Sequence, residues 1–228
     1  MSASSKQKLN RQDFITLIPL RGGSKGIPKK NLRALNNSPL YHYVVNASLN
    51  AQIKTFISTE DPEIKEDCKK SFSTVQIIDR PIELAKDNST TEDVIEHFLD
   101  IEPSTKHIVL LQATSPLTKS EEITMAISKY IKHSYLPLIS VIHEHSFLWN
   151  KEGQPINYDP FNRPRRQDWE GIYRENGAIY IFSKEHFDQQ KSRASSKCTL
   201  YEMNKETLFE IDDFGDLEIV SSFLKKKL

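Results

Sequence analysis

Apolar runs alternate along this chain with longer segments that carry helical patterns. The runs that have the character of strands lie near 14–20, 53–59, 74–79, 107–112, 136–142, 177–182 and 206–211. Helix starts are marked by Ser38-Pro39 and Asp61-Pro62, because each pair places a cap before a proline at the first helical position. Thr118-x-x-Glu121 matches a capping box that opens a helix to about 133, and a last helix is expected near 214–225. This alternation predicts a three-layer α/β/α fold with a mostly parallel twisted sheet.

Two segments depart from the alternation. Residues 1–12 are polar and are expected to form a disordered N-terminal lead, and 13–228 are expected to form a single domain. Between 143 and 172 the rhythm is lost, and Pro, Asn, Arg and aromatic residues gather. A loop of that length inside a compact domain is usually functional or ordered by a partner. We therefore treat 143–172 as an insertion with a function of its own.

The first predicted strand runs into a loop that is rich in glycine and in cations. The loop contains Gly22, Gly23, Gly26, Arg21, Lys25, Lys29 and Lys30. Glycines permit positive φ angles and a close approach to a ligand, and exposed backbone N–H groups can face an anion. In open parallel sheets, ligands bind at the carboxyl ends of the strands, where this loop emerges. The loop therefore predicts a site for a polyphosphate.

Two common phosphate-binding loops are excluded by their spacing. A Walker loop needs Gly-Lys five residues after its first glycine, and the residues that follow Gly22 and Gly23 at that distance are Ile27 and Pro28. The dinucleotide fingerprint needs glycine at position 21, which is Arg21. A nicotinamide-dependent oxidoreductase of similar topology is therefore not supported.

Composition narrows the class further. Lys and Arg total 31 and Asp and Glu total 31, so no overall field favours nucleic acid or a membrane surface. No apolar run approaches the roughly 20 residues of a membrane span, and the first residues lack the apolar core of a secretory signal. Cys68 and Cys198 lie far apart and are expected to be free thiols, which indicates a cytoplasmic protein.

Several ordered motifs together resemble the CMP-sialic acid synthetase (acylneuraminate cytidylyltransferase) family. The first is the loop Arg-Gly-Gly-Ser-Lys-Gly-Ile-Pro-x-Lys-Asn at 21–31. The others, in order, are Arg80-Pro81-x-Glu83-Leu84-Ala85, Leu110-Leu111-Gln112-x-Thr114-Ser115-Pro116-Leu117, Arg165-Arg166-Gln167-Asp168, Glu175-Asn176-Gly177-Ala178-Ile179-Tyr180 and Ile211-Asp212-x-x-x-Asp216. The resemblance spans roughly 14–222 and implies the nucleotidyltransferase fold.

The resemblance implies a site for CTP. Its implied CTP-binding residues are Arg21, Gly22, Gly23, Ser24, Lys30, Asn31, Arg80, Ser89 and Thr91. Arg80 would read the base, because the O2/N3 edge of cytosine offers acceptors to a guanidinium fork. Arg21 and Lys30 would neutralise the phosphates, and Lys30 would face charge that develops at the α-phosphate or on pyrophosphate. Arg21, Lys30 and Asp212 are the implied catalytic residues.

The resemblance also implies a sugar site and a metal site. The sugar residues are Gln112, Arg166, Arg174, Asn176 and Tyr180, with Arg165 a rival to Arg166 as the carboxylate clamp. The cations at 163, 165 and 166 could instead form a solvated face or interface ion pairs. Asp212 is the implied Mg²⁺ ligand, and Glu210 stands where the family usually has aspartate. Asp213 and Asp216 are expected to cap the following helix.

The implied reaction joins CTP to a nine-carbon 2-keto sugar acid, with N-acylneuraminate (sialic acid) as the expected substrate, and yields a CMP-sugar and pyrophosphate. The insertion 143–172 would make a homodimer and reach the neighbour's site. Legionaminic, pseudaminic or keto-deoxy-octonic acid remain alternatives, as does a catalytically impaired CTP-binding protein, for which Glu210 is the sign. A zinc site at His143-Glu144-His145 lacks a third ligand in plausible spacing.

Overall fold

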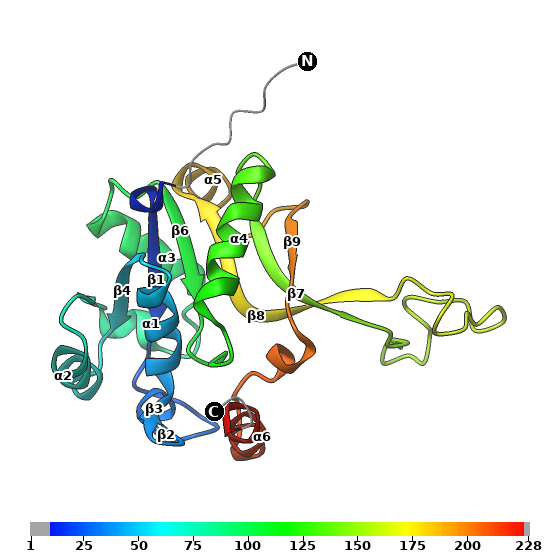
Figure 1. The fold of residues 1–228 in the computed structure, drawn as a ribbon, viewed down its shortest axis with the longest axis horizontal. Helices are drawn as coiled ribbons and strands as arrows, with labels where there is room; N and C mark the ends of the chain where they lie inside the picture. Colours follow the sequence, from blue (N-terminus) through cyan, green and yellow to red (C-terminus); the bar gives the residue numbers. More distant parts are fainter. Residues whose placement is uncertain (1–9, 226–228) are drawn as a thin grey trace.

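One seven-stranded sheet forms the centre of the computed structural model, which describes residues 10–225. Its strand order is β5-β4-β1-β6-β8-β7-β9 (Figure 1). The strands are β1 Phe14–Pro19, β4 Lys54–Thr59, β5 Gln76–Asp79, β6 His107–Leu111, β7 Leu138–Glu144, β8 Ile172–Ser183 and β9 Thr199–Glu202. Only β8 runs against the others, since it pairs antiparallel with both β6 and β7. The mostly parallel sheet is confirmed.

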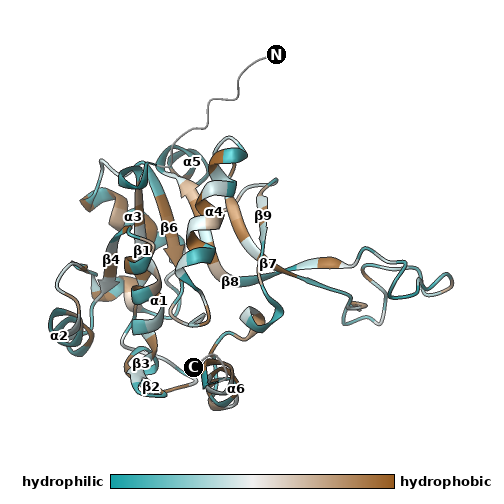
Figure 2. Cartoon of the chain, viewed as in Figure 1, coloured by the Kyte–Doolittle hydropathy of each residue, from teal (hydrophilic) through white to brown (hydrophobic). Residues whose placement is uncertain are grey.

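Helices cover both faces of this sheet. They are α1 Leu40–Asn50, α2 Pro62–Ser71, α3 Thr91–Ile101, α4 Ser120–Lys132, α5 Lys184–Gln190 and α6 Phe214–Lys225. Successive strand residues point to opposite faces, so Leu17 packs with α3 and α5, whereas Ile18 packs with α1, α2 and α4. Both faces are buried, which explains the continuous apolar runs in strands such as β6 (Figure 2).

Short elements complete the described chain. They are the 3-10 turns Arg11–Asp13, Lys30–Leu32, Ile82–Ala85 and Lys205–Leu208 and the hairpin strands β2 Ala34–Leu35 and β3 Ser38–Pro39. A third apolar cluster joins the loop residue Ile27 to Leu117, Ile211 and Val220 of α6. This cluster fixes the segment before α6 against the glycine-rich loop.

Helix starts follow the predicted chemistry with small shifts. Asp61 caps α2 as predicted, because its Oδ1 accepts from the N–H of Glu63 and of Ile64. At α1 the prediction is wrong by one residue: Pro39 is the N-cap and Ser38 pairs in β3. At α4 the predicted box is also displaced, since the Thr118 hydroxyl donates to the Ser115 carbonyl.

The predicted caps before α6 are confirmed. Asp213 Oδ1 accepts from the N–H of Asp216 at 3.0 Å, and Asp216 Oδ2 accepts from the N–H of Asp213 at 3.0 Å. The two side chains thus satisfy each other's backbone donors. Asp216 Oδ2 also accepts from the N–H of Asp212, so the cap fixes the backbone of the implied metal ligand.

Two of the segments predicted from the sequence differ in the structure. The strand predicted at 206–211 is wrong, because 205–208 form a 3-10 turn and the Ile211 N–H donates to the Thr114 carbonyl instead of to a strand. The edge strand is β9 in its place. The disordered lead predicted for 1–12 is wrong at its end, where Asn10 caps an ordered turn; residues 1–9 lie outside the described residues.

The insertion forms an arm, which we define as residues 143–172. Strands β7 and β8 run on beyond the sheet as a two-stranded ribbon and carry the arm away from the body (Figure 1). Within the arm, the rings of Phe147 and Trp169 stack, with centroids 4.7 Å apart. Trp149 and Ile156 are exposed, and Phe161 is 99% exposed.

Two smaller predictions can be checked in the same residues. Cys68 and Cys198 are both free, as expected. Within residues 10–225, every helix is too short or too polar to cross a bilayer.

Candidate active site

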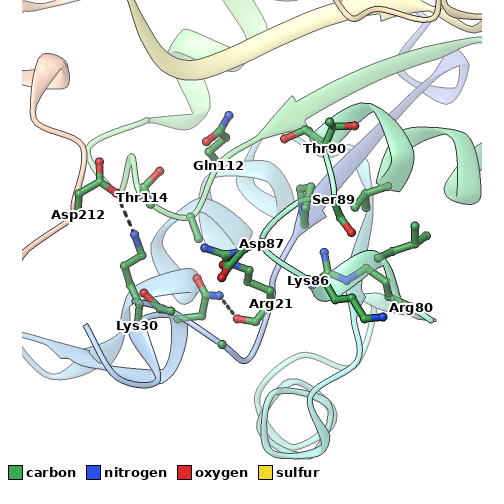
Figure 3. A pocket seen from close by; sticks show the side chains of 18 of the residues that line it. Arg21, Lys30, Arg80, Lys86, Asp87, Ser89, Thr90, Gln112, Thr114 and Asp212 are labelled. Carbon is green, nitrogen blue, oxygen red and sulfur yellow. Dashed lines mark hydrogen bonds and ion pairs between the residues drawn. The ribbon is translucent and has the colours of Figure 1, made fainter. Parts of the chain in front are cut away.

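A cavity of about 430 Å³ lies at the carboxyl ends of β1, β5 and β6, where the resemblance placed its motifs. Its lining includes the predicted residues Arg21, Gly23, Ser24, Lys30, Asn31, Arg80, Ser89, Thr91, Gln112, Glu210 and Asp212. Figure 3 shows Lys30 and Asp212 at one end, Arg80 and Ser89 at the other, and Arg21 between them. Segments far apart in the chain thus converge on one site.

Two of the three loop glycines, Gly22 and Gly26, are required by close packing. The expected positive φ angles are wrong for Gly22, Gly23 and Gly26, because the positive-φ glycines of the described chain lie elsewhere. A Cβ on Gly26 would lie 2.2 Å from the carbonyl oxygen of Asp212, and one on Gly22 would lie 2.1 Å from the carboxylate of Asp61. Gly23 meets nothing within 4 Å and borders the cavity, so it leaves room for a ligand.

The cations of the loop differ in what they face. Lys30 Nζ donates to the Ile211 carbonyl at 2.9 Å and to Asp212 Oδ1 at 3.0 Å, and its side chain is only 17% exposed. Arg21 and Lys25 both contact Asp87, whose pKa they hold below its usual value, with the Lys25 hydrogen bond as the largest cause. Lys29 turns away to Glu63 on the surface. Lys30 and Arg21 are therefore the loop cations that line the cavity.

Asn31 shapes the loop from within. Its Nδ2 donates to the Arg21 carbonyl at 2.8 Å, and the residue is buried. This bond closes the loop into a turn, which is the arrangement that directs its remaining backbone N–H groups toward an anion.

Arg80 is held in place at the other end of the cavity. Its Nε and Nη2 donate to Glu60 Oε2 at 3.1 and 2.7 Å, and Nη2 also donates to the Leu20 carbonyl at 2.6 Å. These bonds leave Nη1 for a ligand. Arg80 can therefore offer one guanidinium nitrogen to a base, not the two-nitrogen fork that the sequence predicted. Glu60 Oε1 accepts from the Gly22 N–H at 2.7 Å, so the expected phosphate donor at Gly22 is already used.

Ser89 and Thr91 flank the same end. The Ser89 hydroxyl donates to the Glu83 carbonyl at 2.7 Å, and Thr91 begins α3, whose cap is Thr90. Both residues line the cavity through a tight turn before the helix. The positive end of the α3 dipole therefore points toward the cavity.

The opposite end carries amide, hydroxyl and carboxylate groups. Gln112 and Thr114 follow β6, and the buried Thr114 Oγ1 has no hydrogen-bond partner in the described chain. Burial, together with the nearby charges of Asp212 and Glu175, raises the pKa of Glu210. The Glu210 carboxylate lies against Gly177, where a Cβ would approach it to 2.7 Å. Glu210 and Asp212 thus present carboxylates on the same side of the cavity.

Four predicted sugar residues lie outside the lining of the cavity: Arg166, Arg174, Asn176 and Tyr180. Arg174 is exposed on β8, and its positive charge offsets a small part of the rise in the pKa of Glu210. The Tyr180 hydroxyl donates to Glu175, and burial and that bond raise the Tyr180 pKa.

Asn176 corrects the expectation of a direct sugar contact. It is fully buried, its Oδ1 accepts from the Ser140 hydroxyl at 2.6 Å, and its Nδ2 donates to the Thr207 hydroxyl at 2.8 Å. Both ends of the amide are therefore engaged inside the protein. The residue sits at the register shift between β7 and β8, and it supports Gly177 and hence Glu210.

Arg166 and its rival Arg165 lie exposed on the arm, which leads away from the cavity of the same chain (Figure 1). Arg163 differs, because its guanidinium lies over the rings of Phe147 and Tyr158, at 4.2 and 5.5 Å from their centroids. Arg163 therefore helps to hold the arm together, whereas Arg165 and Arg166 are exposed.

The donor set at 210–212 fits a magnesium ion. Mg²⁺ takes one or two carboxylates together with substrate phosphates, and Glu210 and Asp212 supply two beside the phosphate loop. No group of three or more His, Cys, Asp or Glu in the described part of the chain could hold a metal on its own, which disfavours zinc at His143-Glu144-His145.

Sequence reasoning missed three residues at this site: Glu60, Lys86 and Asp87. Lys86 and Asp87 line the cavity, and Glu60 lies behind it. Glu60 directly follows a predicted strand, so its place at the carboxyl edge of the sheet could have been found. Asp87 gives no comparable signal, because it stands in an irregular segment.

Comparisons with known proteins give the family of the chain. The chain matches the cytidylyltransferase family model over residues 15–222, and it belongs to that family. Among solved structures, CMP:2-keto-3-deoxy-manno-octonic acid synthetase complexed with CTP gives a TM-score of 0.68 at 16% identity, covering 94% of this chain and 99% of that one. The 4-diphosphocytidyl-2C-methyl-D-erythritol synthase of Anaerococcus prevotii gives 0.69 at 9%, covering 95% and 100%. These two show the fold.

Curated relatives share a higher sequence identity with this chain than these two structures do. The N-acylneuraminate cytidylyltransferase of Oncorhynchus mykiss is 34% identical over 216 residues, covering 91% of this chain and 49% of its own. That of Streptococcus agalactiae serotype V is 32% identical over 212 residues, covering 89% and 51%. The chain therefore spans about half the length of the curated relatives it matches.

Proposed function

We propose that this protein transfers the cytidylyl group of CTP to a nine-carbon 2-keto sugar acid, with an N-acylneuraminate as substrate and a CMP-sugar and pyrophosphate as products. One observation carries the proposal: the cationic loop, Arg80, Gln112 and the carboxylates at 210–212 converge on one cavity. Membership of the cytidylyltransferase family supports the nucleotide, and the acylneuraminate relatives support the sugar.

The nucleotide half follows from the position of the charges. Arg80 at one end would contact the cytosine, Ser89 and Thr91 the base and ribose, and Arg21 and Ser24 the phosphates. Lys30, enclosed near Asp212, would face the α-phosphate or the departing pyrophosphate. Such transfers depend on positioning and on fixed positive charge around an in-line displacement at phosphorus.

The sugar half would lie toward Gln112, Thr114 and the arm. The anomeric 2-hydroxyl attacks the α-phosphorus, forms the new P–O bond and releases its proton to solvent. The bond from the α-phosphorus to the oxygen that bridges to the β-phosphate breaks, and pyrophosphate leaves with that oxygen. The Gln112 amide can donate and accept hydrogen bonds at the sugar. The carboxylate of the sugar suits a guanidinium, which Arg166 or Arg165 would supply. Glu210 and Asp212 would hold Mg²⁺, which would withdraw charge from the phosphates and would lower the pKa of the attacking hydroxyl.

The arm supports the proposal of a homodimer. Arg165 and Arg166 are exposed on the arm, which leads away from the body of its own chain (Figure 1), while Trp149, Ile156 and Phe161 expose apolar surface. Exposed apolar groups gathered in this way mark interaction sites. We propose that the arm of one chain brings its arginines to the sugar end of a second chain's cavity.

A pyrophosphate-release assay tests the reaction. Purified protein with CTP, Mg²⁺ and N-acetylneuraminate is expected to release pyrophosphate, and EDTA is expected to stop it. A panel with legionaminic, pseudaminic and keto-deoxy-octonic acid then ranks the acceptors by kcat/KM. Activity that is insensitive to the chelator would contradict the role of Asp212. If the protein binds CTP but releases no pyrophosphate with any of these sugar acids, the alternative of a catalytically impaired CTP-binding protein would be favoured.

A further inference from the structure

Glu60 belongs to none of the sequence motifs, yet it contacts both halves of the nucleotide site. It follows β4, and its side chain is only 12% exposed. One carboxylate oxygen accepts from the Gly22 N–H at 2.7 Å, and the other accepts from Arg80 Nε and Nη2 at 3.1 and 2.7 Å. A single side chain therefore joins the phosphate loop to the base-reading residue.

These bonds decide which part of Arg80 meets a ligand. The Leu20 carbonyl takes a further bond from Nη2, so the N–H groups of Nε and Nη2 are committed inside the protein. Nη1 keeps its two N–H donors for the cavity that Arg80 lines. With the guanidinium held on one edge, this donor cannot rotate away or present an acceptor.

A fixed donor can select between pyrimidines. Cytosine offers acceptors at both O2 and N3, whereas uracil carries an N–H donor at N3 that would oppose an arginine N–H. Leaving buried donors unpaired is a strong means of discrimination. The orientation that Glu60 gives Arg80 therefore favours CTP over UTP.

We propose that Glu60 is a positioning residue for nucleotide selection, which orients Arg80 on the base and sets its distance from the phosphate loop. The proposal rests on the proposed function, since it takes CTP as the ligand. Glu60 retains its charge in this role: burial alone would raise its pKa, but the bonds from Gly22 and Arg80 bring the pKa below its usual value.

The test compares CTP and UTP dissociation constants by calorimetric titration of three variants. Glu60→Gln keeps the shape but has one acceptor oxygen, so it cannot serve both Gly22 and Arg80. We expect CTP affinity to fall about ten- to hundredfold and the preference for CTP over UTP to shrink. Glu63→Gln is the matched control, because Glu63 contacts the exposed Lys29 instead; its constants should not change. Glu60→Asp keeps the charge and should recover part of the preference.

The outcomes separate the two proposals. Failure of the unaltered protein to bind CTP would overturn the proposed function. Tight CTP binding by the unaltered protein, with Glu60→Gln within twofold of it for both nucleotides, would overturn only this inference. An equal loss for CTP and UTP in both Glu60 variants would also overturn it, because a purely structural role weakens every nucleotide alike.

Discussion

The base end of the cavity and the arm are built in opposite ways. At the base end, Arg80 is nearly enclosed and is bonded to Glu60 and to the backbone of the same chain. On the arm, Phe161 is almost fully exposed and Arg166 faces outward. The first region is organised by its own chain before a ligand arrives, whereas the second presents groups that a second chain would cover. The base end is thus organised within one chain, whereas under the proposed function the sugar end would be completed by the arm of a second chain.

The largest effect is expected inside the organised region. Lys30→Ala should lower kcat by about a hundred- to thousandfold, because it removes a fixed positive charge beside the reacting phosphate. Lys29→Ala is the control, since that neighbour pairs with Glu63 on the surface and should leave kcat unchanged. Steady-state kinetics and circular dichroism of both variants provide the measurement. Near-normal turnover of Lys30→Ala would remove Lys30 from the mechanism.

The incomplete region can be tested by mixing two inactive variants. Lys30→Ala disables a cavity, and Arg165→Ala combined with Arg166→Ala disables an arm. If arms act across a dimer, equal mixing with subunit exchange should restore about a quarter of the sites, because half of the dimers are mixed and each has one intact combination. Sedimentation velocity should show the dimer. No recovery in exchanging mixed dimers would place the arm's arginines outside the partner's site.

Two glycines of the glycine-rich loop, Gly26 and Gly23, give a third comparison. Gly26→Ala should lower the free energy of unfolding by about 1–3 kcal/mol, because its Cβ would overlap the Asp212 carbonyl at 2.2 Å. Gly23→Ala meets open space, so it should leave stability unchanged and weaken CTP binding instead. Urea denaturation and titration separate the two effects. Equal stability of both variants would contradict the close packing at Gly26.

The smallest expected effect is a change in stability at acidic pH. The pKa of Glu60 lies below its unfolded value, so its contribution to stability is present above the unfolded pKa, near 4.3, and is lost as the pH falls through the folded pKa. The stability gap between the unaltered protein and Glu60→Gln should therefore be full at neutral pH and narrow below about pH 4. Melting temperatures across this range measure it. A gap independent of pH would refute the charged state of Glu60.

The sequence was informative wherever local chemistry decides the outcome. The loop after β1, the cap at Asp61 and the carboxyl ends of β5 and β6 were all predicted, because cap residues and apolar periodicity act over a few positions. The strand at 206–211 was not, since Ile211 bonds to Thr114, far away in the chain. The family resemblance implies a sugar contact for Asn176, and the sequence does not reveal its actual partners, because Ser140 and Thr207 are distant along the chain.

The register shift in β8 has a mechanical consequence. Between the pairs Ile139–Tyr180 and Val141–Glu175, β8 carries extra residues that include Gly177 at φ +64°, so it consists of two straight pieces joined at a bend. The Asn176 side chain fixes that bend through hydrogen bonds with the Ser140 and Thr207 hydroxyls. The ribbon beyond the bend accordingly leaves the body in a set direction, and in the dimer proposed above the core of each chain would fix the angle at which the other approaches.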